Sequence, residues 1–78
     1  MIKSLEPMTD LGKYLERKSV SKAGIAKKTG ISKSRLSQLT NNESTQLKVW
    51  ELYLIALAID VDPCEIIKEV CKGLKLEN

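Results

Sequence analysis

The sequence contains no histidine and no phenylalanine, and aromatic residues make up only 4% of the chain. Without histidine it lacks the commonest general base and the commonest metal ligand. It also has no Gly-rich phosphate loop, and no Ser or Cys is paired with a base in a recognisable pattern. These absences argue against an enzyme. We expect no catalytic residue, no metal and no cofactor.

Cysteine is scarce, with only Cys64 and Cys71. On one helix these residues would be about 10–11 Å apart along the axis, which is too far for a disulfide within the chain. We interpret both as small buried hydrophobic residues. The alternatives are a thiol pair across a dimer axis and a weak metal site.

Long apolar runs are also missing. No stretch approaches the roughly 20 apolar residues of a membrane span, and the first ten residues lack the apolar centre of a signal peptide. We therefore expect no membrane association and a reducing, cytoplasmic location.

The residues that are present favour one small helical domain spanning 1–78. The hydrophobic fraction is 42%, which suffices for a single core. Few aromatic or β-branched runs occur, so an all-α fold is expected. Charge is unevenly spread, because residues 11–48 hold nine cations and two acids, whereas residues 49–78 hold three lysines and six acids. A basic segment of this kind suggests a polyanionic partner.

Apolar spacing and boundary residues predict five helices, at residues 7–18, 22–29, 32–39, 47–59 and 63–73. Pro7 and the Asp62–Pro63 pair are typical of helix starts. Ser21 and Ser32 are predicted N-caps, and Gly30 is predicted to end the second helix. The fourth helix is expected to be the most buried, with the face that includes Trp50 and Leu57 in or beside the core. The alternative for Trp50 and Tyr53, spaced three apart, is the border of a subunit interface.

Residues 21–40 have the shape of a helix-turn-helix. Two helices of about eight residues are joined by a short turn that starts with Gly30, where φ is expected to be positive. Ala26 is predicted to lie where the two helices cross. Four apolar residues are expected to fill the wedge between them: Ile25, Ile31, Leu36 and Leu39.

The run SKAGIAKKTGISKSRLSQLTNN resembles the Cro/CI-type (Xre) family of phage and bacterial repressors, and ELYLIALAIDVDPCEII resembles the helix pair that follows in that family. The resemblance covers roughly residues 11–68. It implies a compact five-helix lambda-repressor-like domain that binds double-stranded DNA in the cytoplasm and regulates transcription, most simply as a repressor. The sequence departs from the family pattern at Gly24, Thr29 and Thr40.

Chemistry and resemblance together give the candidate DNA contacts, with helix 32–39 in the major groove. Glutamine can pair with adenine and lysine with guanine. The predicted base contacts are Lys33, Ser34, Ser37 and Gln38. The predicted phosphate contacts are Lys22, Ser32, Arg35, Asn41 and Asn42. Each residue could instead be ordinary polar surface, but their joint placement inside the basic segment favours DNA.

A single short recognition helix reads few base pairs, so we expect a homodimer on a pseudo-palindromic operator. The dimer is expected to form through the fourth and fifth helices, with the fifth, residues 63–73, as the natural interface, because the adjacent Ile66 and Ile67 cannot both face one core. Two alternatives stay open. One is the DNA-binding antitoxin of a toxin–antitoxin pair, with its acidic final third docking the toxin, and the other is a protein-interaction module that has lost DNA binding.

Overall fold

The computed structural model describes residues 8–77, and this part of the chain contains five α-helices and no strand. The helices are α1 (Asp10–Arg17), α2 (Lys22–Thr29), α3 (Lys33–Asn41), α4 (Val49–Ala58) and α5 (Pro63–Val70). The predicted all-α, five-helix fold is therefore confirmed. No helix among the described residues is both long and apolar enough to traverse a bilayer.

Four helices begin at a side chain that accepts a backbone N–H of the first turn. The hydroxyls of Thr9, Ser21 and Ser32 accept from residues three positions on, at 2.9–3.1 Å, and Asp62 accepts from Cys64 at 2.9 Å. These bonds satisfy donors that a helix start otherwise leaves free. The predicted caps at Ser21, Ser32 and Asp62 are confirmed.

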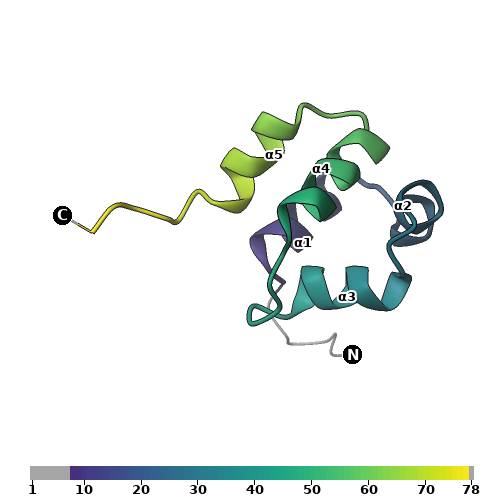
Figure 1. Cartoon of the computed structure of the whole chain (residues 1–78), viewed down its shortest axis with the longest axis horizontal. Helices are drawn as coiled ribbons and strands as arrows, with labels where there is room; N and C mark the ends of the chain where they lie inside the picture. The colour runs from purple at the N-terminus through teal and green to yellow at the C-terminus, as the bar shows by residue number, and fades with distance from the viewer. Residues whose placement is uncertain (1–7, 78) are drawn as a thin grey trace.

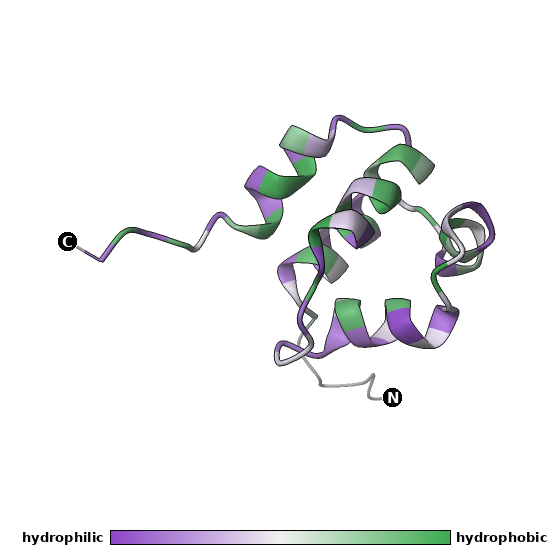
Figure 2. Ribbon diagram, viewed as in Figure 1, coloured by the Kyte–Doolittle hydropathy of each residue, from purple (hydrophilic) through white to green (hydrophobic). Residues whose placement is uncertain are grey.

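The helices close into a ring around one core. α1 packs against α3 and α5, α2 packs against α3 and α4, and α4 packs against α5 (Figure 1). The side of α3 that is turned toward the other helices is hydrophobic, and its outer side is hydrophilic (Figure 2). The buried hydrophobic side chains are Leu11, Tyr14, Leu15, Ile25, Ile31, Leu36, Leu39, Leu52, Ile55, Ala56 and Ile66.

α1 and the end of α3 approach each other very closely. The Thr9 amide donates to the Thr40 carbonyl at 2.9 Å, and the Thr9 hydroxyl donates to the Leu39 carbonyl at 2.8 Å. A Cβ on Gly12 would collide with the same Thr40 carbonyl oxygen. Glycine at position 12 therefore allows α1 to support α3 by direct backbone contact.

Several predicted helix boundaries were wrong. α1 begins at Asp10, because Thr9 is extended and acts as its cap; Pro7, the predicted start, lies outside the described residues. α3 continues through Thr40 and Asn41, which were predicted as loop, because Thr40 is buried against α1. α4 is shorter than predicted at both ends, and α5 ends at Val70.

The predicted orientation of α4 was also wrong. Its buried residues are Glu51, Leu52, Ile55 and Ala56, whereas Trp50 is 54% exposed and Leu57 is 53% exposed. The helix is apolar on two sides, and the side that includes Leu52 and Ile55 faces the core. The helix is therefore not uniformly buried, and its second apolar side faces outward.

Both cysteines are exposed, so their interpretation as buried residues was wrong. Ile66 is the buried residue of α5. Cys64 and Cys71 lie two residues before it and five after it, and at 3.6 residues per turn both positions fall on the opposite side of the helix.

Candidate nucleic-acid interface

α2 and α3 form the predicted helix-turn-helix. Gly30 ends α2 in the left-handed conformation, with φ at 82°, and its amide donates to the Ala26 carbonyl at 2.9 Å. A residue with a Cβ would be strained there. The backbone then extends through Ser32, which caps α3. The predicted turn at Gly30 and the predicted cap at Ser32 are confirmed.

Thr29, a departure from the family pattern, has a clear role in this turn. Its hydroxyl donates to the Ile25 carbonyl at 2.8 Å and accepts the Ile31 amide at 3.0 Å. The side chain thereby satisfies a carbonyl of α2 and an amide of the turn. Ile25 and Ile31 on either side are buried, as are Leu36 and Leu39 of α3. The wedge between the helices is filled as predicted.

The outer face of α3 presents the predicted base-reading residues. Lys33, Ser34 and Gln38 are exposed, and Ser37 is half-buried. Spacings of three and four residues place all four on one side of the helix. Because α3 lies along one edge of the described ring (Figure 1), this polar side faces away from the other helices.

The predicted phosphate contacts lie at the helix ends of the motif. Lys22 opens α2 and is half-buried, and Ser32 uses its hydroxyl to cap α3. Asn41 ends α3 and is exposed. The Asn42 side-chain oxygen accepts from the amide and the hydroxyl of Ser44, at 3.0 and 2.8 Å.

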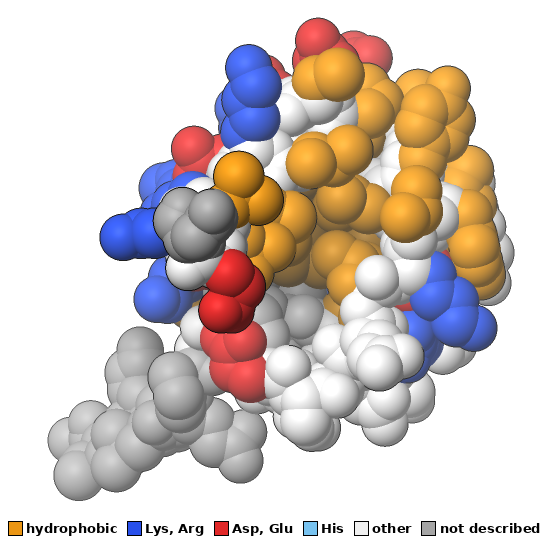
Figure 3. All heavy atoms as spheres, turned by 60° about the vertical axis from the view of Figure 1, so that its left-hand side comes forward, with side chains coloured by type: hydrophobic (Ala, Val, Ile, Leu, Met, Phe, Trp, Pro, Cys, Tyr) orange, Lys and Arg blue, Asp and Glu red, His pale blue; other side chains and the backbone are white. Residues whose placement is uncertain are grey.

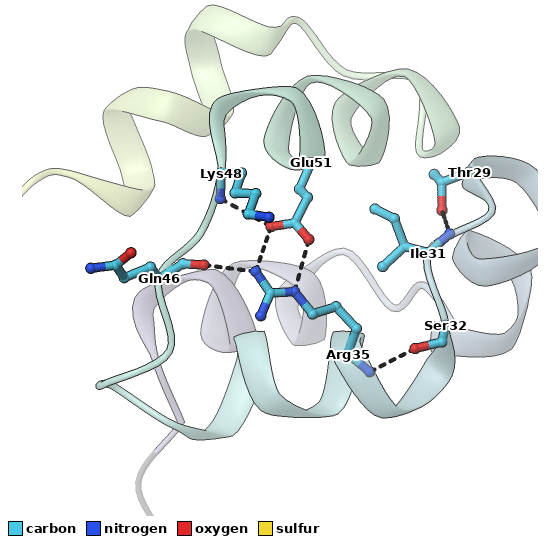
Figure 4. A network of polar contacts seen from close by, with 7 residues as sticks. All are labelled: Thr29, Ile31, Ser32, Arg35, Gln46, Lys48 and Glu51. Atoms are coloured by element: carbon cyan, nitrogen blue, oxygen red, sulfur yellow. Dashed lines mark hydrogen bonds and ion pairs between the residues drawn. The ribbon is translucent and has the colours of Figure 1, made fainter.

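The guanidinium of Arg35, a predicted phosphate contact, is hydrogen-bonded within the domain. Its Nε and Nη2 donate to the two carboxylate oxygens of Glu51 at 2.8 and 2.9 Å, and Nη2 also donates to the Gln46 carbonyl at 2.8 Å (Figure 4). Glu51 in turn accepts the Lys48 amide at 3.0 Å and so caps α4. Arg35 thus joins α3 to α4 and points into the domain.

The Glu51 carboxylate is held in its charged form. Its side chain is only 4% exposed, and burial opposes ionisation. The hydrogen bond from Arg35 outweighs that penalty, with a further contribution from the Lys48 amide, so the pKa of Glu51 is held below its ordinary value of 4.5. The same pairing raises the pKa of Arg35.

The acidic final third neutralises cations of the basic segment outside the helix-turn-helix. Arg17 pairs with Glu69 at 2.9 Å, and Lys18 pairs with Glu65 at 3.6 Å. Together with Arg35, three cations thus have internal partners. Among the described residues, six lysines of the basic segment make no ion pair. Four lie in α2 and α3, namely Lys22, Lys27, Lys28 and Lys33, and the other two are Lys13 and Lys48. Lys28 reaches the Ala58 carbonyl at 3.4 Å.

Sequence reasoning missed Glu51 as the partner of Arg35. The two residues are 16 positions apart. The usual capping-box pattern has Ser or Thr at the N-cap, and Lys48 stands there instead, so the local pattern gave no signal. Within residues 8–77 there is no group of three or more side chains that could hold a metal ion.

Comparison with known families gives a match over most of the chain. The model of the Cro/C1-type HTH DNA-binding domain matches residues 10–72. This range covers all five helices, including the α2–turn–α3 motif. No curated protein and no solved structure matched the chain significantly.

Proposed function

The chain belongs to the Cro/C1-type helix-turn-helix DNA-binding domains, and from this we propose that it is a sequence-specific transcriptional regulator that inserts α3 into the major groove of double-stranded DNA. One observation carries the proposal. The exposed side of α3 holds four hydrogen-bonding side chains, while its other side is packed against α1 and α2. A rigidly held helix with a free polar edge is suited to reading bases.

In this proposal Lys33 and Gln38 read base edges, with Ser34 and Ser37 beside them. Lysine donates to guanine O6 and N7, and glutamine pairs with adenine N6 and N7. The phosphates are contacted by Lys22, by Asn41 and Asn42, and by the start of α3 at Ser32, where backbone N–H groups favour an anion. Arg35 is left out, because Glu51 and Gln46 occupy its guanidinium.

We also propose that the regulator is a homodimer that binds a pseudo-palindromic operator and represses by occupying it. One copy of α3 covers few base pairs, and two copies one helical turn apart would give the specificity that a genome requires. The exposed hydrophobic side chains of α4 and α5, among them Trp50, Tyr53 and Ile67, support an interface on that side. This is the side on which a dimer through the fourth and fifth helices is expected.

The test is selection of binding sites from random duplexes with the purified protein, repeated with Lys33→Ala and Gln38→Ala. Each variant should relax the preference at one base pair by roughly 1–3 kcal/mol. Lys22→Ala should weaken binding to all sequences alike. Lys68→Ala, an exposed lysine on α5, is the matched control and should change neither. An unaltered motif in both α3 variants would contradict the proposed reading face.

An antitoxin is the second candidate, because the exposed apolar side of α4 and α5 could also hold a toxin. The DNA-binding face would be the same in that case. Copurification of a basic partner expressed from the neighbouring gene, released by Trp50→Ser, would favour this alternative over a free-standing repressor.

A further inference from the structure

The large exposed hydrophobic side chains of the described chain gather on one side of the molecule. α4 and α5 contribute Val49, Trp50, Tyr53, Leu57 and Ile67, which we call the α4–α5 face. Figure 3 shows hydrophobic side chains crowded on this side around a hollowed area. An apolar patch of this kind marks an interaction site rather than ordinary surface.

A cavity lies where α5 ends near the loop before α4. Two of its lining residues are neighbours of the face in sequence, since Val70 comes three positions after Ile67 and Leu47 two positions before Val49. Its volume is about 120 Å³, and its apolar lining comes from Leu11, Leu39, Leu47 and Val70. The two charged residues that line it, Asp10 and Glu43, are both acids. The cavity therefore suits an apolar side chain carried on a positively charged segment.

The segment that follows α5 has these properties. Leu74 is 77% exposed and Leu76 is 92% exposed, and the segment leads away from the helices (Figure 1). In an extended chain, residues two apart point to the same side. The two leucines would thus form one apolar edge. Lys75 stands between them, Glu77 follows, and Lys72 lies 3.9 Å from Glu69 of α5.

We propose that in the dimer the Leu74 and Leu76 side chains of each copy pack on the α4–α5 face of the other copy. This rests on the homodimer proposed above and names what covers its apolar face. Two-fold symmetry makes the exchange reciprocal, so each copy gives one segment and receives one.

Three observations favour a second copy as the occupant. The segment leaves its own domain in the outward direction (Figure 1). Lys75, between the two leucines, complements the acids at the cavity, Asp10 and Glu43. The face alone is also small, since five large side chains fall well short of the 20–30 residues a side of an ordinary stable interface. Adding Leu74 and Leu76 from the partner extends the buried apolar area.

The first experiment compares the double variant Leu74→Ser/Leu76→Ser with Lys75→Ser, which changes the intervening residue. Sedimentation gives the dimer dissociation constant. Acrylamide quenching of the fluorescence of Trp50, the single tryptophan, shows whether the α4–α5 face is shielded from solvent. We expect the leucine variant to raise the dissociation constant by at least about tenfold and to expose Trp50. The Lys75 variant should stay within about threefold. All affected side chains are exposed in the single domain, so folding should be unchanged by circular dichroism.

The second experiment mixes two deficient chains. One carries Leu74→Ser/Leu76→Ser and keeps its face, and the other carries Trp50→Ser/Tyr53→Ser and keeps its leucines. Neither chain alone can form the proposed contact. In a mixed dimer, the leucines of the second chain can pack on the intact face of the first, so one of the two contacts is restored. The mixture should therefore associate more tightly than either chain alone.

The outcomes separate this proposal from the dimer itself. If the leucine variant dimerises as tightly as the full chain, the exchange is overturned and the dimer stands. If the full chain is monomeric at high micromolar concentration with Trp50 freely quenched, both proposals fail. The full chain could also be monomeric with Trp50 protected from quenching except in the leucine variant. In that case the segment folds back on its own domain, and the proposed exchange of segments between two copies is overturned.

Discussion

Replacing Arg35 by methionine should destabilise the domain severely through Glu51. The change removes the donors at 2.8 and 2.9 Å from the two carboxylate oxygens and leaves the Lys48 amide at 3.0 Å. The Glu51 side chain is 4% exposed, and a methionine stem would still cover it while offering no hydrogen-bond donor. A buried carboxylate without its partner costs about 3–5 kcal/mol.

For Glu51 we expect a loss near the lower end, about 3 kcal/mol at pH 7, because one hydrogen bond remains. In a domain of this size that corresponds to a fall in Tm of about 12–24 °C. Urea or thermal unfolding followed by circular dichroism measures it. Arg35→Met combined with Glu51→Leu should recover part of the loss, since an apolar pair fills the site without a buried charge, while the cap on the Lys48 amide is lost.

The loss should also depend on pH. Because the pKa of Glu51 in the folded protein is depressed, the pair stabilises the fold above the ordinary value of 4.5, and this contribution fades as pH falls below it. In the variant, burial without Arg35 favours the protonated acid. The gap in stability between wild type and Arg35→Met should therefore narrow from pH 7 to pH 4.

Two results would refute this reasoning. One is an Arg35→Met variant as stable as the wild type at pH 7, and the other is a gap in stability that stays constant with pH. The double variant also tests the role of Arg35 on DNA. If Arg35 only supports the fold, the refolded double variant keeps its affinity, whereas a phosphate contact would show as uniformly weaker binding to all sequences.

Three further outcomes are expected. Gly12→Ala should lower the free energy of unfolding by about 1–3 kcal/mol in urea unfolding, because its Cβ meets the Thr40 carbonyl, whereas Gly73→Ala, with open space around it, should not. Asp60→Gly should add roughly 0.5 kcal/mol, because φ is 66° at that residue. The pKa of Tyr14 is raised above 10.0 by burial and by its hydrogen bond to Glu65. The neutral phenol therefore stabilises the fold below pH 10, and this contribution is lost as pH rises above it. The Tyr14→Phe variant should lose less stability at alkaline pH than the wild type, as measured by unfolding followed by circular dichroism.

The sequence predicted those features of the fold that depend on neighbouring residues. The caps at Ser21, Ser32 and Asp62 and the left-handed Gly30 each follow from one residue type beside a helical pattern. They fix where α2, α3 and α5 begin and how the motif turns. The placement of the polar side of α3 then follows from helical geometry and four buried apolar residues.

The features that depend on distant residues could not be predicted in this way. α4 is apolar on two sides, so hydrophobic spacing alone did not distinguish Leu52 and Ile55, which are buried, from Trp50 and Tyr53, which are not. Arg35 looked like one more surface cation of the basic segment. Its partner lies on another helix, and only the packing of α3 beside the start of α4 brings the two charges together.

The internal pairing of Arg17, Lys18 and Arg35 has a consequence for the ionic-strength dependence of DNA affinity. A cation that already faces a carboxylate displaces few condensed counterions from the duplex. The slope of log affinity against log salt should therefore reflect Lys22 of each copy, with any contribution from Lys27 and Lys28 beside it on α2, at roughly 0.9 per phosphate neutralised. The nine cations of residues 11–48 would thus overstate how steeply salt releases this protein from DNA.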